Sequence, residues 1–179
     1  EVDIYEKEED VFAQASSKNQ NRLHLGFHYP RSYITRKQSR DGFYKFLSQY
    51  GQFCKKIKRN IYAVDNKKSL IDFETYKSIM ISSELDFYEV NYPYHEFVNL
   101  DGFIETDERL IDAKSVKKFF KKNLEENLIL STVINDADIE DHKDCILLFG
   151  KKYDYMVNCT WGAFGVFDNL DIYYEPCIT

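Results

Sequence analysis

The chain has 179 residues, of which 44% are hydrophobic and 16% aromatic, so it can bury the core of one ordinary domain. Its net charge of −6 argues against a general nucleic-acid-binding protein, whose surface would be basic. One basic run, residues 55–59, is read as a solvated loop or helix end rather than an anion-binding patch. No run of about eighteen apolar residues occurs, so we expect no membrane span. The four cysteines form no CxxC pair and favour reduced thiols in a cytoplasmic protein.

The first predicted element is a short strand at residues 2–5, where apolar and polar residues alternate before an acidic cluster at residues 6–10. A long polar connection follows at residues 13–31, and connections of this length are often functional. Aromatic and apolar residues at helical spacing then predict a helix over residues 32–50, which Gly51 is expected to end.

The middle of the chain is predicted to contain strands and one helix. Strand patterns occur at residues 61–64 and 87–90, and residues 102–111 are expected to form an extended pair. Asp72 is expected to cap a helix that runs to about Glu84.

The last third begins with the most regular predicted helix, capped by Asp112 and with a buried stripe of Val116, Phe119, Phe120 and Leu124. Strands are predicted at residues 128–134, 145–149 and 153–159. Strands therefore alternate with helices, which predicts the α/β fold class.

No residues make a convincing self-sufficient catalytic group, so no catalytic residue is assigned. His24 and His28 are four residues apart, but Gly26 lies between them, Pro30 follows and no third ligand is indicated, so we expect no metal site. The seven glycines form neither GxGxxG nor GxxxxGK, so the chain contains no recognisable phosphate loop.

Residues 2–7, with the sequence VDIYEK, resemble the second strand of a Rossmann unit in flavoproteins. In such units a carboxylate at the strand end binds the adenosine ribose, about twenty residues after the glycine loop. Because only five residues precede Glu6, this loop would lie upstream of residue 1. A strand that ends in glutamate is common by itself, so further matches are needed.

The segments ASSKNQNRLH (residues 15–24) and GFHYPRS (residues 26–32) resemble a signature of FAD-dependent oxidoreductases of the D-amino-acid-oxidase-like superfamily. In that family this stretch passes the pyrophosphate and then the flavin ring. The alternative is a polar Ω-like loop whose histidines bond to the backbone. The resemblance implies cofactor contacts at Ser16, Ser17, Asn19 and Gln20, and a substrate or flavin face at Arg22, His24, His28 and Tyr29.

Two later segments are similar to the same family. Residues 128–133 resemble a strand in which the backbone of a valine, here Val133, binds the adenine. Residues 153–162 resemble a strand that ends in a threonine–glycine turn near the FAD, although Trp161 separates the two residues here. With these segments, the implied cofactor contacts also include Glu6, Lys7, Val133, Thr160 and Gly162.

The resemblance implies a Rossmann-like FAD-binding domain, without its first strand and glycine loop, at residues 1–50 and 112–162. A partial β-rich substrate domain would comprise residues 53–111 and 163–179. Family members are longer, so the chain resembles a piece truncated at both ends and is expected to be inactive alone.

The activity implied by the resemblance is oxidation of a small amine, amino acid or 2-hydroxy acid by hydride transfer to FAD. The alternative is a non-catalytic binding or interaction module that keeps the fold without flavin. The substrate, the electron acceptor and the oligomeric state are left open by the sequence.

Two geometric expectations follow from the flavoprotein hypothesis. Tyr5 and Tyr155 should lie in one mostly parallel sheet, connected through the helix that begins after Asp112. Glu6, residues 16–20, Val133 and residues 160–162 should converge on one crevice at the carboxyl ends of the strands.

Overall fold

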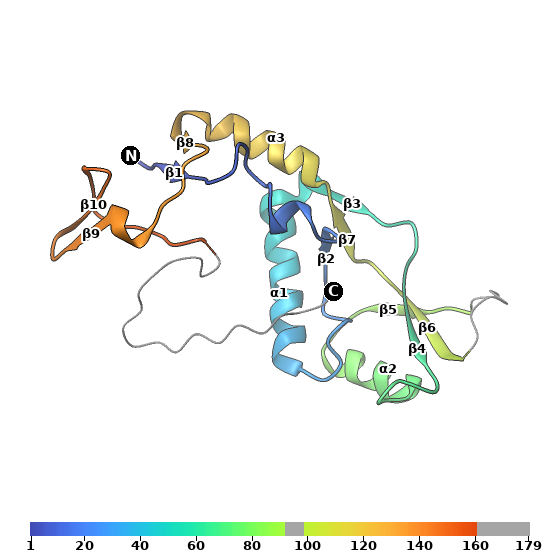
Figure 1. The fold of residues 1–179 in the computed structure, drawn as a ribbon. Coiled ribbons are helices and arrows are strands. Elements are labelled where there is room, and N and C mark those ends of the chain that lie inside the picture. Colours follow the sequence, from blue (N-terminus) through green and yellow to red (C-terminus); the bar gives the residue numbers. More distant parts are fainter. Residues whose placement is uncertain (92–98, 161–179) are drawn as a thin grey trace. The chain divides into compact units, whose positions relative to one another are not determined.

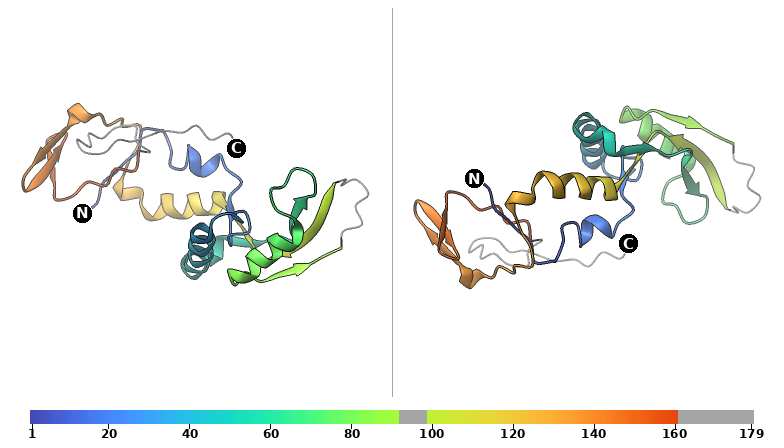
Figure 2. Two further views of the ribbon diagram at one scale, coloured as in Figure 1. Left: turned by 90° about the horizontal axis from the view of Figure 1, so that it is seen from below. Right: turned by 90° about the horizontal axis from the view of Figure 1, so that it is seen from above.

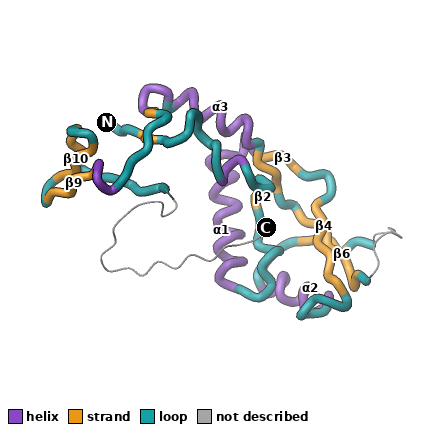
Figure 3. Tube along the Cα trace, viewed as in Figure 1, coloured by secondary structure: helices purple, strands orange, loops and turns teal. Residues whose placement is uncertain are grey.

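The structure is a computed structural model that describes residues 1–91 and 99–160. Its described residues form a mixed α/β arrangement of three α-helices and eleven short strands, joined by long loops (Figures 1 and 3). This mixture of helices and strands is compatible with the α/β class predicted from the sequence, although β1 and β8 form the one parallel pair among the described strands. None of the helices in these ranges has the length and apolar character needed to cross a bilayer.

The contacts of the chain divide it into two compact units. The central unit is Phe12–Glu125, and the terminal unit combines Glu1–Val11 with Glu126–Thr179. The predicted FAD-binding and substrate domains are defined by what they bind, so that division stays a prediction.

The three helices of the central unit are those predicted from the sequence. They are α1 (Tyr33–Tyr50), α2 (Phe73–Ser82) and α3 (Ala113–Asn123). The residue before each helix accepts, through its side chain, a hydrogen bond from a backbone N–H of the first turn. The helix itself provides no acceptor for this N–H. These capping residues are Ser32, Asp72 and Asp112.

Asp112 also binds the Lys55 ammonium at 2.6 Å, and this contact, with the Ser115 backbone N–H, lowers the pKa of its carboxyl to about 2. Because the folded-state pKa lies below the ordinary value of 3.8, the ionised carboxylate stabilises the fold above about pH 4. This contribution is lost as the pH falls towards 2.

We expect Asp112→Ala to lower the urea midpoint of unfolding at pH 6, and the difference from the wild type to shrink between pH 4 and pH 2. Asp86→Ala is the matched control, because it removes an exposed carboxylate that forms no hydrogen bond or ion pair with a described residue. A difference for Asp112→Ala that stays constant down to pH 2 would contradict the assignment.

The main core of the central unit lies between α2 and an antiparallel sheet of order β4–β6–β5, along which α2 runs in all three views (Figures 1 and 2). The strands are β4 (Asn60–Asp65), β5 (Phe87–Glu89) and β6 (Leu100–Thr106). Gly102 of β6 lies directly under the Phe73 ring, so helix and sheet are in close contact. The buried members of the core are Leu25, Phe27, Phe43, Val64, Phe73, Tyr76, Met80, Leu85 and Ile104.

A second antiparallel sheet of the central unit has the order β2–β7–β3. Its strands are β2 (Arg22–Leu23), β3 (Cys54–Lys56) and β7 (Arg109–Ile111). The predicted extended pair over residues 102–111 is therefore wrong as a pair. Its two strands, β6 and β7, belong to different sheets, and the chain changes sheet at Asp107 and Glu108.

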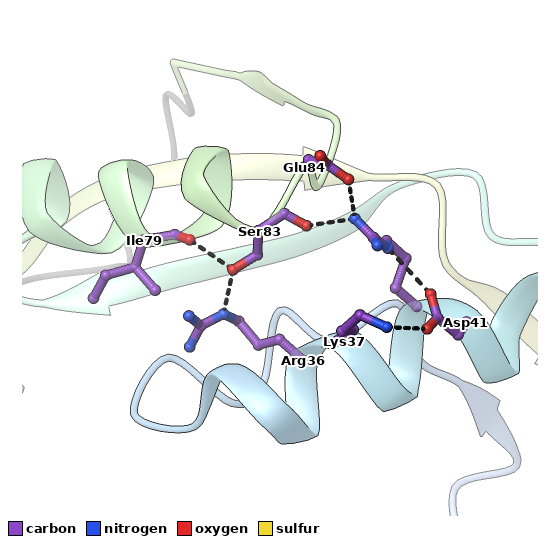
Figure 4. Close-up of polar contacts among 7 residues, drawn as sticks. Arg36, Lys37, Asp41, Ile79, Ser83 and Glu84 are labelled. Carbon is purple, nitrogen blue, oxygen red and sulfur yellow. Dashed lines mark hydrogen bonds and ion pairs between the residues drawn. The ribbon is translucent and has the colours of Figure 1, made fainter.

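Arg36 connects α1 to α2 and to the segment before α1. Its side chain is buried, and its Nε donates to the Ser83 hydroxyl at 2.7 Å (Figure 4). Its Nη1 donates to the carbonyls of Tyr29 and Pro30 at 3.0 and 2.6 Å. Gly26, with φ +121°, packs so closely on the backbone of Arg36 that an added Cβ would lie 2.9 Å from the Arg36 carbonyl oxygen. The segment from Gly26 to Pro30 is thus held against the first turn of α1.

The terminal unit contains a parallel pair and a three-stranded meander. Strand β1 (Ile4–Tyr5) pairs in parallel with β8 (Leu128–Ile129), as Ile4 with Leu128 and Tyr5 with Ile129. The meander is antiparallel and consists of β9 (Ile139–His142), β10 (Cys145–Leu148) and β11 (Lys151–Tyr153).

The prediction that Tyr5 and Tyr155 share a sheet is wrong. Tyr5 lies in β1, whereas Tyr155 follows the end of β11 and lies in no strand. Tyr155 is 88% exposed and Val157 83% exposed. A strand needs a neighbour for its backbone hydrogen bonds, and no described segment pairs with residues 154–160.

Candidate cofactor site

Glu6 stands at the carboxyl end of the parallel pair β1–β8, where nucleotides bind in open α/β sheets. Its backbone is fixed by hydrogen bonds from its N–H to the Ile129 carbonyl (3.0 Å) and from the Thr132 N–H to its own carbonyl (2.9 Å). Its carboxylate Oε1 accepts from the Glu8 N–H at 3.0 Å, and Oε2 has no partner among the described residues. One carboxylate oxygen is therefore available to a ligand. Lys7, the next residue, is exposed and contacts Glu8.

Val133 lies at the same end of this pair. Strand β8 is shorter than the predicted strand over residues 128–134, because Ser131 adopts φ +54° and turns the chain. The Ser131 N–H donates to the Glu8 carbonyl at 2.9 Å, which keeps the turn beside the segment after Glu6. Val133 is 59% exposed, and its peptide groups bond to no described residue. The segments that carry Glu6 and Val133 are therefore hydrogen-bonded to each other, and the role of both residues in cofactor binding stays a prediction.

Thr160 belongs to the same unit, but both of its hydrogen-bond donors bind a residue two positions earlier in the chain. Its N–H and its hydroxyl both contact Asn158 Oδ1, at 3.0 and 2.7 Å. Gly162 lies outside the described residues, so the predicted turn at residues 160–162 stays a prediction.

The predicted pyrophosphate segment lies in the central unit, as an exposed 3₁₀ turn at Ala15–Ser17 and the residues after it. The Ser17 hydroxyl and the Asn19 side chain bond within the segment, to the carbonyls of Gln14 and Ala15. Ser16 and Gln20 have exposed side chains without a described partner. Because this segment and Glu6 belong to different units, their convergence on one crevice stays a prediction.

His24 belongs to a polar cluster around a carboxylate that the sequence analysis does not identify. Glu108 is only 1% exposed, and its Oε2 lies 3.2 Å from His24 Nδ1 and 2.8 Å from the Tyr62 hydroxyl. Asn60 Nδ2 donates to the same oxygen at 3.3 Å, and the Leu25 N–H donates to Oε1 at 2.7 Å. We call Glu108, His24, Tyr62 and Asn60 the Glu108 cluster.

The protonation states in this cluster follow from these contacts. Burial by itself would raise the pKa of the Glu108 carboxyl, but the hydrogen bonds from His24, Tyr62 and the Leu25 N–H outweigh it and lower that pKa. Burial, reinforced by the neighbouring carboxylate, raises the pKa of the Tyr62 phenol. The cluster therefore holds an ionised Glu108 and a neutral Tyr62 at neutral pH.

The other residues predicted at the substrate or flavin face lie near this cluster. The rings of His24 and His28 have centroids 6.2 Å apart, and those of His28 and Tyr29 are 5.4 Å apart. Arg22 lies in β2, and His24 directly follows the end of that strand. Arg22 Nε is buried and has no hydrogen-bond partner in the described ranges. Buried donors in proteins normally have an acceptor, so this group could bind one on a ligand.

An open cavity of about 270 Å³ shares Tyr62 with the cluster, whereas Glu108, His24 and Asn60 are not among its lining residues. Its walls combine apolar and polar side chains, which include Phe27, His28, Tyr62, Val64 and Tyr76. A second cavity of about 280 Å³, beside Phe73 and Asp101, contains none of the predicted site residues.

Sequence reasoning missed Glu108, Tyr62 and Asn60. Glu108 stands in the sequence TDER, which is typical of a solvated turn, and nothing local indicates burial. The one available signal is the short connection between β6 and β7, which consists of Asp107 and Glu108. At this connection the chain changes sheets, and the Glu108 side chain can point inwards.

The chain is similar to FAD-dependent monooxygenases of fungi. It is 37% identical over 177 residues, or 99% of its length, to FAD-dependent monooxygenase FPY4 of Fusarium mangiferae. A shorter match, 37% over 62 residues or 35% of the chain, is to FAD-dependent monooxygenase kojA of Aspergillus flavus. The chain spans 47% of the length of the first relative, and the shorter match spans 14% of the second. No family model matches the chain.

Both relatives are named for FAD, the cofactor predicted from the sequence. These names agree with the coarse prediction of an FAD-dependent oxidoreductase. The finer placement in the D-amino-acid-oxidase-like superfamily stays a prediction.

Proposed function

We propose that this chain is part of an FAD-dependent oxidoreductase that oxidises a small molecule. The observation that carries the proposal is the similarity to an FAD-dependent monooxygenase along 99% of the chain. The geometry at the end of β1 and β8 supports it, since an acidic residue follows a strand of a parallel pair there.

The residues present fit a dinucleotide at two places. In the terminal unit, the open oxygen of Glu6 can accept hydrogen bonds from ribose hydroxyls, and the free peptide groups of Val133 can pair with an adenine edge. In the central unit, the exposed Ser16 and Gln20 offer polar groups suited to phosphate oxygens, and the buried Arg22 Nε lacks an acceptor. Lys7, Ser17, Asn19, Thr160 and Gly162 remain proposed contacts of the same cofactor.

FAD, when bound, supplies the redox chemistry and accepts two electrons from a reductant or substrate. The protein groups orient the substrate, exclude water and move protons. The Glu108 cluster and the cavity that shares Tyr62 with it place an imidazole, a phenol and apolar walls together, which suits a small substrate with one hydroxyl or amine group. His28 and Tyr29 belong to the same proposed face.

Two reaction types are consistent with this arrangement. The sequence resemblance implies hydride transfer from an amine, amino acid or 2-hydroxy acid, whereas the relatives are named as monooxygenases. We propose flavin-dependent oxidation as the common function and favour monooxygenation as its form, because the matched relative covers nearly the whole chain. The domain division at residues 1–50 with 112–162 and 53–111 with 163–179, the Rossmann-like topology and a cytoplasmic location are parts of the same proposal.

The direct test is to purify the protein expressed from its complete gene and to measure its absorption spectrum and extracted cofactor. We expect bound FAD in near-equimolar amount. Turnover under ¹⁸O₂ then separates the reactions, since a monooxygenase incorporates one labelled oxygen atom into the product and a hydride-transferring oxidase incorporates none. A folded, colourless protein that binds no added FAD would favour the non-catalytic module instead.

Glu6→Ala is expected to weaken FAD binding by about 1–3 kcal/mol, or roughly 5- to 150-fold in Kd, which is the scale of hydrogen bonds to a charged group. Glu6→Gln, which keeps an acceptor for the Glu8 N–H but loses the charge, should show a smaller loss in the same direction. Fluorescence titration of the apoprotein with FAD measures both.

The matched control is Glu9→Ala, which removes an exposed carboxylate of the same acidic cluster that has no described partner. Its Kd should equal that of the wild type. An unchanged Kd in Glu6→Ala would remove Glu6 from the cofactor site.

A further inference from the structure

Glu108 is the only carboxylate that is buried among the described residues, and it lies where the chain passes from β6 to β7. Removing a carboxylate from water costs free energy unless hydrogen bonds replace its hydration. Here four donors surround the two oxygens, from Tyr62, Asn60, His24 and the Leu25 backbone. These donors come from parts of the chain far apart in sequence, so only the folded chain stabilises this buried charge.

The donors determine which imidazole nitrogen carries the proton. An ionised carboxylate only accepts hydrogen bonds, so the 3.2 Å contact requires a hydrogen on His24 Nδ1. The Tyr62 hydroxyl has a single hydrogen, which it donates to Glu108 at 2.8 Å, and its oxygen can accept at 3.3 Å from His24 Nδ1. The neutral imidazole therefore carries its hydrogen on Nδ1 and a lone pair on Nε2.

His24 Nε2 is free to act on a ligand. The His24 side chain is 31% exposed, and Nε2 has no described hydrogen-bond partner. Nearby stand the His28 ring and the Tyr62 side chain, which also line the cavity of about 270 Å³. A carboxylate that holds one imidazole nitrogen and leaves the other open is the arrangement by which proteins orient a histidine base.

We propose that Glu108 is a positioning residue that holds His24 in the Nδ1–H tautomer, so that His24 Nε2 accepts the hydroxyl or amine proton of the substrate. This proposal rests on the proposed function. In the step, the substrate O–H or N–H bond breaks, its electron pair stays on the substrate atom, and an Nε2–H bond forms. His24 becomes an imidazolium whose positive charge is balanced by the Glu108 carboxylate. This proton transfer changes no oxidation state. The two-electron oxidation itself uses FAD. Monooxygenation also uses O₂ and a two-electron reductant such as a reduced nicotinamide, because one oxygen atom enters the product and the other leaves as water.

The decisive variant is Glu108→Gln, which keeps the size of the side chain. Its amide oxygen is expected to stay with the Leu25 N–H, the shortest backbone contact of the carboxylate. The amide NH₂ then faces His24 Nδ1 and donates to it, which forces the hydrogen of the imidazole onto Nε2. The variant should thus invert the tautomer and remove the proton acceptor.

The tautomer is measured by long-range ¹H–¹⁵N correlation of the imidazole in the protein expressed from its complete gene, at a pH where the ring is neutral. We expect Nδ1–H in the wild type and in Tyr62→Phe, and Nε2–H in Glu108→Gln. An Nε2–H wild type would overturn the proposal, and so would a Glu108→Gln variant that keeps Nδ1–H. If Glu108→Gln does not fold, the wild-type and Tyr62→Phe spectra decide by themselves.

Turnover gives the second measurement. Glu108→Gln should reduce kcat by about 10²–10⁴-fold, the range for loss of a correctly oriented histidine base, with the FAD content unchanged. Thr106→Val is the matched control, because the Thr106 hydroxyl accepts from Asn60 at 2.6 Å and is not among the hydrogen-bond partners of Glu108 or His24 in the described residues. It should keep both the Nδ1–H tautomer and most of kcat. Equal losses of kcat in the two variants would overturn the positioning role.

The two proposals fail in different ways. A wild-type protein without bound FAD would reject the proposed function, whatever the tautomer of His24. A flavin-containing enzyme in which Glu108→Gln inverts the tautomer but leaves kcat and its pH profile unchanged would keep the function and reject His24 as the proton acceptor.

Discussion

Gly102→Ala is expected to lower the free energy of unfolding by about 3 kcal/mol, at the upper end of the range for overpacked cores. The reason is the contact between α2 and β6. An added Cβ at residue 102 would lie 2.2 Å from Cδ1 of the Phe73 ring, far inside the ordinary carbon–carbon separation of about 3.5–4.0 Å. The ring is buried at the start of α2, so moving it away would disturb the packing of the helix on the sheet.

Gly42→Ala is the matched control for this substitution. Gly42 lies inside α1, and no atom outside its own helical turn approaches its added Cβ within 4 Å. The same glycine-to-alanine change should therefore stabilise the protein by about 0.5–1 kcal/mol through the lower entropy of the unfolded chain. Urea unfolding of the two variants should move the midpoint in opposite directions. A neutral Gly102→Ala would mean that the helix does not pack on β6 as described.

Arg36→Met is expected to cost about 2–4 kcal/mol of stability. The substitution keeps an apolar stem but removes the guanidinium, which binds the Ser83 hydroxyl (Figure 4). The same guanidinium also binds the carbonyls of Tyr29 and Pro30. Buried acceptors that lose their donors cost more than an ordinary hydrogen bond is worth. The turn that carries His28 should also become more mobile, because the carbonyls of Tyr29 and Pro30 lose their hydrogen bonds to Arg36.

Arg40→Met provides the comparison, one turn later on the same helix face. The Arg40 guanidinium is partly exposed and donates to the Ser83 carbonyl and to Glu84 Oε2, at 2.9 and 2.6 Å. Water can replace these contacts, so the loss of stability should be clearly smaller. Urea unfolding, with amide exchange of residues 26–30 as a local measurement, distinguishes the two variants. Equal losses would show that burial of Arg36 has no special role.

Of the geometric expectations of the flavoprotein hypothesis, the strand pair that ends at Glu6 is present and the shared sheet of Tyr5 and Tyr155 is not. The acidic residue after β1 and the parallel partner β8 agree with a nucleotide-binding strand pair. The predicted strand through Tyr155 is not formed, so the Rossmann-like topology rests on this pair alone. The near full-length similarity to an FAD-dependent monooxygenase is an independent reason to test for the cofactor first.

The sequence by itself determined the features that depend on neighbours a few residues away. The caps at Asp72 and Asp112 and the three helices were predictable, because a capping side chain and the helical spacing of apolar residues act within one or two turns. The acidic end of β1 and the polar segment at residues 15–24 were also recognisable, since short motifs carry them.

Only the tertiary structure decided what depends on distant partners. Whether a strand forms is set by its neighbour: Tyr5 has Ile129 as its partner, whereas residues 154–160 have none in the described part of the chain. The charged sequence around Glu108 looks like a surface turn, and burial became apparent only when donors from Tyr62, His24 and Leu25 met around its carboxylate. The physical reason is that a hydrogen-bond donor 46 or 84 residues away leaves no local pattern, although it decides whether a buried charge can be tolerated.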